Sequence, residues 1–250
     1  MSVRILHGDC REVLAGLPDE HFDLVIADPP YGETSLSWDR RVRGWPELVR
    51  PKLKRFGSMW VFGSMRMFMD CACEFGGWKL SQDVVWEKHN GTGLFNDRFR
   101  RVHEHALHFY RDDAKWSEVF RSPRFTNDAT ARTVRKKGRP AQWIGATGET
   151  IYRSIDGGPR LMRSVIYARS EHGRAEHPTQ KPIGIVEPLL LYACHPGGAI
   201  LDPFAGSGVT GLLARRHGMS AVLIEANPAY TAVAERRIAD DAPLFSGAAP

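Results

Sequence analysis

The segment "LVIADPPYGE" (24–33) ends an apolar run with an acid, two prolines and a tyrosine. Pro29 and Pro30 fix the backbone φ angle and remove two N–H donors, so the loop is rigid and rich in acceptors. The Asp28 carboxylate and the Pro29 carbonyl are then placed to hold N–H groups of a substrate, with the Tyr31 ring beside them. An ordinary strand-ending turn is the alternative, and this segment alone does not exclude it.

The segment "ILDPFAGSGVTG" (200–211) predicts a strand, a glycine-rich turn and the start of a helix. Gly206 and Gly208 permit positive φ and close approach of a ligand, and a helix N-terminus offers free N–H groups. No Lys-Ser/Thr pair follows the glycines, which argues against a P-loop. Gly206, Gly208 and Gly211 have the spacing of the dinucleotide-binding pattern G-x-G-x-x-G, but the turn begins with "DPFAG", so this match is weak. Glu225 ends the next predicted strand, where an acid can accept ribose hydroxyls. Together these features indicate an adenosine-containing ligand; a generic βαβ turn with a capping acid is the alternative.

Positive charge is concentrated in one part of the 250-residue chain, whose net charge is +5. Residues 98–174 contain 17 Lys and Arg against 8 Asp and Glu, a net +9, whereas the remainder contains 17 against 21, a net −4. This asymmetry indicates either a polyanion-binding face or a solvated surface with a chance excess of arginine, and charge alone does not choose between them.

The composition is that of a globular protein, with no apolar run of membrane-spanning length and no signal peptide. The four cysteines fit neither a zinc spacing nor a dense disulfide framework, so we expect a reducing, cytoplasmic environment. His103, Glu104 and His105 are considered together as a candidate metal site. The two histidines would share one face of a strand, but no third ligand is evident. We therefore expect no metal site.

Hydrophobic periodicity predicts strands alternating with helices, which is typical of a parallel α/β sheet covered on both faces. The predicted strands are 3–8, 22–27, 58–64, 82–89, 103–111, 199–202 and 221–225, and the predicted helices include 45–54, 65–75 and 182–195, the last with Pro188 inside it. From about 111 to 176 periodicity fades and Arg, Gly, Thr and Pro dominate.

The segments "DPPYG", "HPTQKP", "DPFAGSGVTG" and "IEANPAY" stand together in this order. That combination resembles the β group of the S-adenosylmethionine-dependent DNA amino-methyltransferases, which act on adenine N6 or cytosine N4. The resemblance implies a Rossmann-like methyltransferase fold, circularly permuted, with a mostly parallel seven-stranded sheet and an irregular insertion. Residues 1–110 and 175–245 would form the catalytic core, and residues 111–174 the target-recognition region.

In this family the first motif carries catalysis, which implies catalytic roles for Asp28, Pro29, Pro30 and Tyr31. A base inside a duplex cannot be reached, so it must be flipped out, and Tyr31 would stack on it. A motif that begins with Asp favours adenine N6, while cytosine N4 remains the alternative. A catalytically inactive DNA-binding protein is a third hypothesis, against which the intact motifs argue. The motif order argues against RNA or protein methyltransferases.

The resemblance also implies S-adenosylmethionine as cofactor, double-stranded DNA as partner and a homodimer. Glu225 would bind the ribose, Asp9 the cofactor's adenine, and Thr179 and Lys181 the methionine carboxylate; a surface lysine before a helix is the alternative for Lys181. The complete predicted cofactor set is Asp9, Asp28, Thr179, Lys181, Asp202, Phe204, Gly206, Ser207, Gly208 and Glu225. The predicted DNA-binding set is Arg98, Arg100, Arg132, Arg135, Lys136, Lys137 and Arg139.

Overall fold

The computed structural model of the chain describes residues 2–92, 96–136, 150–171 and 180–241. The chain divides into two compact units, one formed by Met1–Ser122 with Ser164–Pro250 and the other by Pro123–Arg163. The second unit falls within the segment 111–174 that the sequence assigns to target recognition. Within the described part of the chain, no helix combines the length and the apolar character that a membrane crossing requires.

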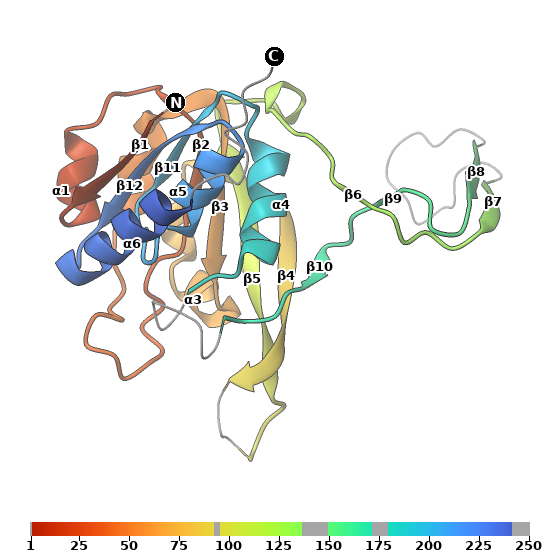
Figure 1. The fold of residues 1–250 in the computed structure, drawn as a ribbon, viewed down its shortest axis with the longest axis horizontal. Helices are drawn as coiled ribbons and strands as arrows, with labels where there is room; N and C mark the ends of the chain where they lie inside the picture. Colours follow the sequence, from red (N-terminus) through yellow and green to blue (C-terminus); the bar gives the residue numbers. More distant parts are fainter. Residues whose placement is uncertain (1, 93–95, 137–149, 172–179, 242–250) are drawn as a thin grey trace. The chain divides into compact units, whose positions relative to one another are not determined.

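The first unit is built on one sheet with the strand order β1-β12-β11-β2-β3-β5-β4-β10 (Figure 1). Neighbouring strands are parallel except where β5 runs against β3 and β4. The strands are β1 (Val3–His7), β2 (Phe22–Ala27), β3 (Leu53–Gly63), β4 (Trp78–Thr92), β5 (Arg101–Arg111), β10 (Val165–Tyr167), β11 (Ala199–Asp202) and β12 (Ser220–Glu225).

The C-terminal strands β11 and β12 lie between the N-terminal strands β1 and β2. This arrangement confirms the circularly permuted, mostly parallel α/β fold. The sheet has eight strands rather than the expected seven. The additional strand, β10, is only three residues long, too short to show a period, and lies in the segment that we expected to be irregular.

Helices cover both faces of the sheet (Figure 1). On one face α5 packs against both α4 and α6; on the other, α2 packs against α1 and η2 packs against both α2 and α3. These elements are α1 (Cys10–Ala15), α2 (Trp45–Val49), α3 (Met65–Asp70), η2 (Ala72–Phe75), α4 (Ile183–Ala193), α5 (Val209–Arg216) and α6 (Pro228–Asp240), with further 3-10 turns η1 (Arg50–Lys52) and η3 (Trp116–Glu118). Helix α4 stays one helix around Pro188.

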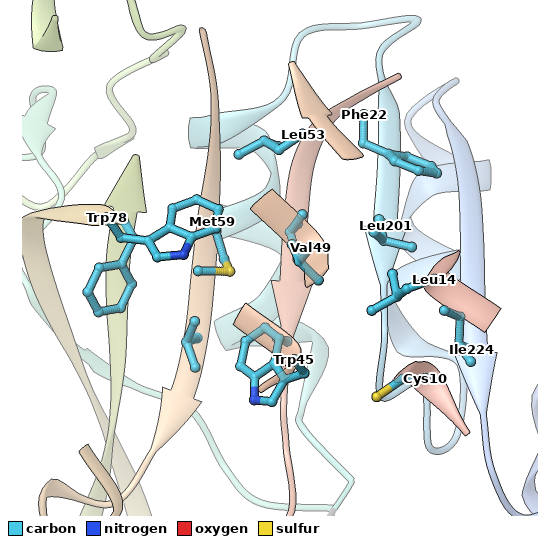
Figure 2. Close-up of a cluster of buried hydrophobic side chains, with 14 of the residues drawn as sticks. Cys10, Leu14, Phe22, Trp45, Val49, Leu53, Met59, Trp78, Leu201 and Ile224 are labelled. Carbon is cyan, nitrogen blue, oxygen red and sulfur yellow. The ribbon is translucent and has the colours of Figure 1, made fainter. Parts of the chain in front are cut away.

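Alternate residues of β3 point to opposite faces, which shows how the sheet separates two cores. The Trp60 ring N–H donates to the carbonyl of Leu189 in α4 at 3.1 Å. Met59 instead belongs to a buried cluster with Leu14 of α1 and Trp45 of α2 (Figure 2). Because both faces are buried, the central strands have the continuous apolar sequences from which they were predicted.

The long hairpin of β4 and β5 extends beyond the carboxyl edge of the parallel strands. Gly63, the last residue of β3, is paired with His105, whereas the β4–β5 ladder continues to Thr92 and Arg101. The hairpin therefore projects from the edge at which β1, β2, β11 and β12 also end.

The second unit consists of two small antiparallel ladders. β6 (Phe125–Thr126) pairs with β9 (Arg160–Leu161), and β7 (Arg132–Lys136) pairs with β8 (Thr150–Ser154). Arg132 and Arg135 are exposed and stand three positions apart on β7. Because side chains alternate along a strand, these two arginines point to opposite faces of the ladder.

Gly208 precedes α5 with φ +74°, a left-handed conformation. A Cβ placed there would lie 2.8 Å from the Cβ of Ala234 in α6. The missing side chain therefore allows close packing of the turn against α6.

We predict that Gly208→Ala destabilises the fold by about 1 kcal/mol from backbone strain and by a further ~1–3 kcal/mol from the steric clash. The matched control is Gly197→Ala, because Gly197 has φ +77° but has no atom within 4 Å of a built Cβ. Urea denaturation of both variants measures the two contributions separately. Equal losses in the two variants would show that the contact with Ala234 costs nothing.

Candidate active site

A cavity of about 1830 Å³ opens at the carboxyl edge of the sheet. The residues that directly follow β1, β2, β11 and β12 line it, together with the β4–β5 hairpin. The following predicted site residues are part of this lining: Asp9, Asp28, Pro29, Pro30, Tyr31, Arg98, Arg100, Lys181, Asp202, Phe204, Gly206, Ser207 and Glu225.

Asp28 follows β2 directly, and both of its carboxylate oxygens have partners. The Tyr31 hydroxyl donates to Asp28 Oδ1 at 2.9 Å, and the Lys181 ammonium donates to Oδ2 at 2.6 Å. The backbone turn through Pro29 and Pro30 places Tyr31 so that its hydroxyl returns to the acid three residues earlier. The rigid loop therefore holds its own carboxylate in a fixed orientation.

Glu104 of β5 links this loop to the neighbouring strands. It accepts a hydrogen bond from the Tyr31 hydroxyl at 3.1 Å and lies 3.4 Å from the Lys181 ammonium. Its other oxygen accepts from Lys88 of β4. Two carboxylates and two ammonium groups thus balance in charge within one buried cluster, Asp28–Lys88–Glu104–Lys181, which we call the charge cluster.

Aromatic rings surround the ammonium group of Lys181. It lies 5.4 Å from the ring centroids of both Tyr31 and Phe62, and 6.0 Å from that of Trp86. Lys181 is only 6% exposed. Cation–π attraction and the two carboxylates together compensate for the water that this buried charge has lost.

The surroundings shift the pKa of each acid in the cluster differently. Burial raises the pKa of Asp28, assisted by the nearby negative Glu104 and only partly opposed by Lys181. Burial would also raise the pKa of Glu104, but Lys181 and Lys88 outweigh it and lower that pKa to about 2. The pKa of Lys181 is raised, because Asp28 and Glu104 outweigh the effect of burial. Asp28 is therefore the more basic carboxylate of the pair, and Glu104 the permanently charged one.

Asp39 shapes the loop that follows the Asp28–Tyr31 segment. Its carboxylate accepts from the backbone N–H groups of Gly32, Glu33 and Thr34 at 2.8, 3.0 and 2.7 Å. Burial would raise the pKa of Asp39, but the hydrogen bond from the Thr34 hydroxyl, at 2.7 Å, and these backbone hydrogen bonds outweigh it and lower the pKa. The side chain thus satisfies three consecutive donors and fixes the path of the chain beyond Tyr31.

The glycine-rich turn is held by two acids at strand ends. Asp202 accepts from the Phe204 N–H at 2.9 Å and from the Thr210 hydroxyl at 2.6 Å. Glu225 accepts from the Gly206 N–H and from the Asn227 N–H, each at 2.8 Å. Burial raises the pKa of both acids, that of Asp202 to about 7.

Comparisons with known proteins match this architecture. A family model described as DNA methylase, of the N6/N4 methyltransferase type, covers residues 22–236. The chain belongs to this DNA methylase family. It is a site-specific DNA methyltransferase, and the methyl donor of its family is S-adenosylmethionine.

Two curated relatives span most of the chain. Type II methyltransferase M.HinfI of Haemophilus influenzae is 28% identical over 268 aligned positions, which cover 96% of this chain and 69% of the relative. Type II methyltransferase M2.DpnII of Streptococcus pneumoniae is 25% identical over 260 positions, covering 94% and 88%.

Two solved structures share the fold. The M1.HpyAVI–SAM complex has a TM-score of 0.63 at 23% identity and covers 94% of this chain and 99% of that chain. The cytosine-N4-specific PvuII DNA methyltransferase has a TM-score of 0.65 at 16% identity and covers 96% and 91%.

The predicted cofactor-binding residues of this methyltransferase each have their own contacts within the protein. Asp9 caps α1 and pairs with Arg11, which lowers its pKa. Ser207 accepts a hydrogen bond from Arg237 of α6 at 2.9 Å. Gly208 is not among the residues that line the cavity, and it packs against Ala234 of α6.

Lys181 is paired with Asp28 and Glu104 in the charge cluster. Its motif implies a contact with the methionine carboxylate, and for that contact Lys181 would have to share or exchange these two partners. Among the remaining predicted residues, Thr179, Lys137 and Arg139 lie outside the described part of the chain. Arg132, Arg135 and Lys136 belong to the second unit, whereas Arg98 and Arg100 line the cavity.

Sequence reasoning assigned no role at the site to Lys88, Trp86 or Asp39, and it considered Glu104 only as a metal ligand. Glu104 stands two residues before the buried Ala106 on β5, and Lys88 stands two residues after the buried Trp86 on β4. Because side chains alternate along a strand, both charged side chains lie on the buried side of their strands. A charged residue at a position where the strand pattern expects an apolar one could therefore have indicated both as site residues. No such signal exists for Asp39, because most of its partners are backbone groups of a loop.

Among the residues that the structure describes, no three His, Cys, Asp or Glu side chains group as metal ligands would. His103 and His105 share one face of β5, with ring centroids 5.3 Å apart. All four cysteines, Cys10, Cys71, Cys73 and Cys194, carry free thiols.

The raised pKa of Asp202 predicts how stability depends on pH. Folding raises this pKa from 3.8 to about 7, so the folded state holds the proton more tightly than the unfolded chain does. The resulting stabilisation is fully present below pH 3.8, the pKa in the unfolded chain, and is lost as the pH rises through about 7, the pKa in the folded state. Asp202→Asn removes this dependence.

We therefore compare the free energy of unfolding of Asp202→Asn with that of the wild type. The variant's value minus the wild-type value should increase from pH 4 to pH 8, a window set by these two pKa values. Urea denaturation of both proteins across this range measures the difference. A difference that stays flat or falls with pH would contradict the assignment.

Proposed function

We propose that this methyltransferase transfers a methyl group to the N6 amino group of adenine in double-stranded DNA, with the target base flipped out of the helix. The observation that carries the proposal is the Asp28 carboxylate, oriented by Tyr31 and Lys181 inside the cavity that also contains the glycine-rich turn. Asp at the first position of the motif favours adenine.

The exocyclic amine of adenine is a weak nucleophile, because its lone pair is delocalised into the ring. Acceptors on both N–H bonds favour a more tetrahedral nitrogen and free that lone pair. Asp28 serves as one acceptor, since each oxygen of a carboxylate can accept two hydrogen bonds and each has one partner here. The Pro29 carbonyl serves as the other. The ring of Tyr31, held through its hydroxyl, stacks on the base.

The charge cluster prepares Asp28 for this role. Its raised pKa makes it a better proton acceptor than an ordinary carboxylate when the methylated amine loses a proton. Lys181 offsets the cost of keeping Asp28 ionised, and Glu104 with Lys88 holds Lys181 in position without adding net charge. Catalysis then rests on groups already oriented before the base arrives.

The lining of the cavity fits S-adenosylmethionine. Gly206 has φ +51° and lies at the cavity wall, so a ligand can approach its backbone closely. Glu225 would bind the ribose hydroxyls, Asp9 the adenine amine, and Phe204 and Asp202 the methionine half. The bound cofactor supplies an electrophilic methyl group on a sulfonium sulfur.

Cytosine N4 is the second candidate target. Its support is the structural likeness to the cytosine-N4-specific PvuII enzyme, which at 16% identity concerns the fold alone. Both target amines require the same pair of acceptors, so the geometry of Asp28 and Pro29 suits either. Identification of the modified base decides between them.

We further infer that residues 111–174 recognise the target sequence, with Arg132 and Arg135 of the second unit in contact with phosphates. Their exposure and the net +9 of residues 98–174 support this inference. A homodimer, which the family resemblance implies, and a cytoplasmic location remain predictions; analytical ultracentrifugation tests the dimer.

The central test is modification-aware sequencing of DNA from methylation-free cells that express the protein. We expect N6-methyladenine at one short sequence with the wild type and none with Asp28→Ala, which should still bind S-adenosylmethionine in calorimetry. The control is Asp113→Ala, which removes a partly exposed partner of Arg111 far from the cavity lining. Near wild-type methylation by Asp28→Ala would refute the catalytic assignment, and N4-methylcytosine would select the second candidate.

DNA affinity should depend on Arg132 and Arg135. Because each phosphate contact contributes about 0.9 to the slope of log K against log salt, the double variant Arg132→Ala/Arg135→Ala should flatten that slope by ~1–2. Fluorescence anisotropy across a salt series measures the slope. Arg4→Ala, at an exposed position on the edge strand β1, is the control and should leave it unchanged. An unaltered slope in the double variant would remove both arginines from the phosphate contacts.

A further inference from the structure

Phe99 lies fully exposed near the end of the β4–β5 hairpin. Its relative exposure is 101%, the highest among the exposed large hydrophobic residues that the structure describes. A single exposed hydrophobic side chain does not by itself indicate a partner. An aromatic ring that is fully exposed, flanked by positive charges and part of a cavity lining does suggest an external partner.

The neighbours of Phe99 define the chemistry of that partner. Arg98, Arg100 and Arg101 flank it, and Asp97 is the sole acid among residues 96–101, which we call the hairpin tip. The tip therefore carries a net charge of +2 around one apolar ring. An arginine-flanked aromatic side chain suits a polyanion with flat apolar groups, which is the chemistry of a nucleic acid.

The hairpin tip faces the catalytic loop. Phe99 and its three arginines line the same cavity as Asp28 and Tyr31. The tip owes this position to the β4–β5 ladder, which continues past the last residue of β3. The ring thus stands at the rim of the cavity that would receive the target base.

Two contacts anchor the hairpin beside the catalytic loop. Arg101 pairs at 3.0 Å with Glu33, two residues beyond Tyr31, and Glu33 also accepts from Ser64 at the start of α3. On the other strand, His89 Nδ1 lies 3.3 Å from the backbone N of Ser170. The ring is therefore presented from an anchored support and not from an isolated loop.

We propose that Phe99 inserts into the DNA stack at the place that the flipped target base vacates. This inference rests on the proposed function, because it requires a base that leaves a duplex. A flipped base exposes the faces of its two stacked neighbours, and an aromatic ring between them restores stacking. Arg100, and Arg98 after it exchanges its surface partner Asp97 for a phosphate, bind the phosphates beside the gap, while Arg101 stays paired with Glu33. The inserted ring keeps the base from returning.

The test compares methylation of a paired and an unpaired target. Single-turnover rates are measured for the wild type, Phe99→Ala and Phe99→Trp on duplex DNA with the target paired, and on the same duplex with the target in a mismatch. Phe99→Ala should methylate the paired target roughly tenfold more slowly or worse, since stacking of one ring on a base is of that size. It should come within about threefold of the wild type on the mismatch, where the base is already partly unpaired. Phe99→Trp should retain the wild-type rate on both.

A second measurement follows the base itself. A 2-aminopurine in place of the target base becomes fluorescent when it is unstacked, and Phe99→Ala should reduce this signal while the wild type and Phe99→Trp retain it. The matched control is Phe56→Ala, because Phe56 is an exposed phenylalanine beside Arg55 that does not line the cavity. It should behave as the wild type throughout.

The outcomes separate this inference from the proposed function. Wild-type rates for Phe99→Ala on the paired target, or an equal loss on the paired and mismatched targets, would overturn the insertion and leave the methyltransferase function intact. Absence of DNA methylation by the wild type would overturn both.

Discussion

The ion pair between Lys181 and Asp28 joins two parts of the chain that are 153 residues apart in sequence. Asp28 directly follows β2, and Lys181 comes just before α4, so the pair connects the Asp28–Tyr31 loop to the segment that begins the C-terminal half of the core. The contact therefore couples the folding of the permuted core to the orientation of the Asp28 carboxylate, the proposed acceptor for the target amine.

The rest of the site can be understood as support for that pair. Glu104 comes from β5, beside β3, and Lys88 from β4, the next strand in the sheet. They add one negative and one positive charge, so that the cluster stays balanced. Tyr31 links both carboxylates through one hydroxyl. On the other side of the cavity Glu225 and Asp202 hold the glycine-rich turn through backbone N–H groups. Most of these polar groups thus have two roles: they hold a loop in place, and they present an oxygen or a charge to the cavity.

Sequence patterns predicted the sheet well because its central strands are buried on both faces and its helices are amphipathic. The predictions of β2 at 22–27 and β11 at 199–202 agree with the structure residue for residue. The strand β10 was missed, since three residues show no period. Glu104 was considered only with its flanking histidines, because neighbours along the chain are visible in a sequence, whereas its partners Tyr31 and Lys88 are not.

The sequence by itself determined the fold class, the two chemical motifs and their order, because apolar periodicity and glycine–proline turns are local properties. It also indicated that a basic segment is set within a mildly acidic body. Only the tertiary structure decided that Lys181 contacts Asp28, that Gly208 makes room for Ala234, and that Phe99 stands exposed at the rim of the catalytic cavity. Each of these depends on which strands become neighbours in the sheet, and hydrogen bonding between distant segments leaves no periodic trace in the chain.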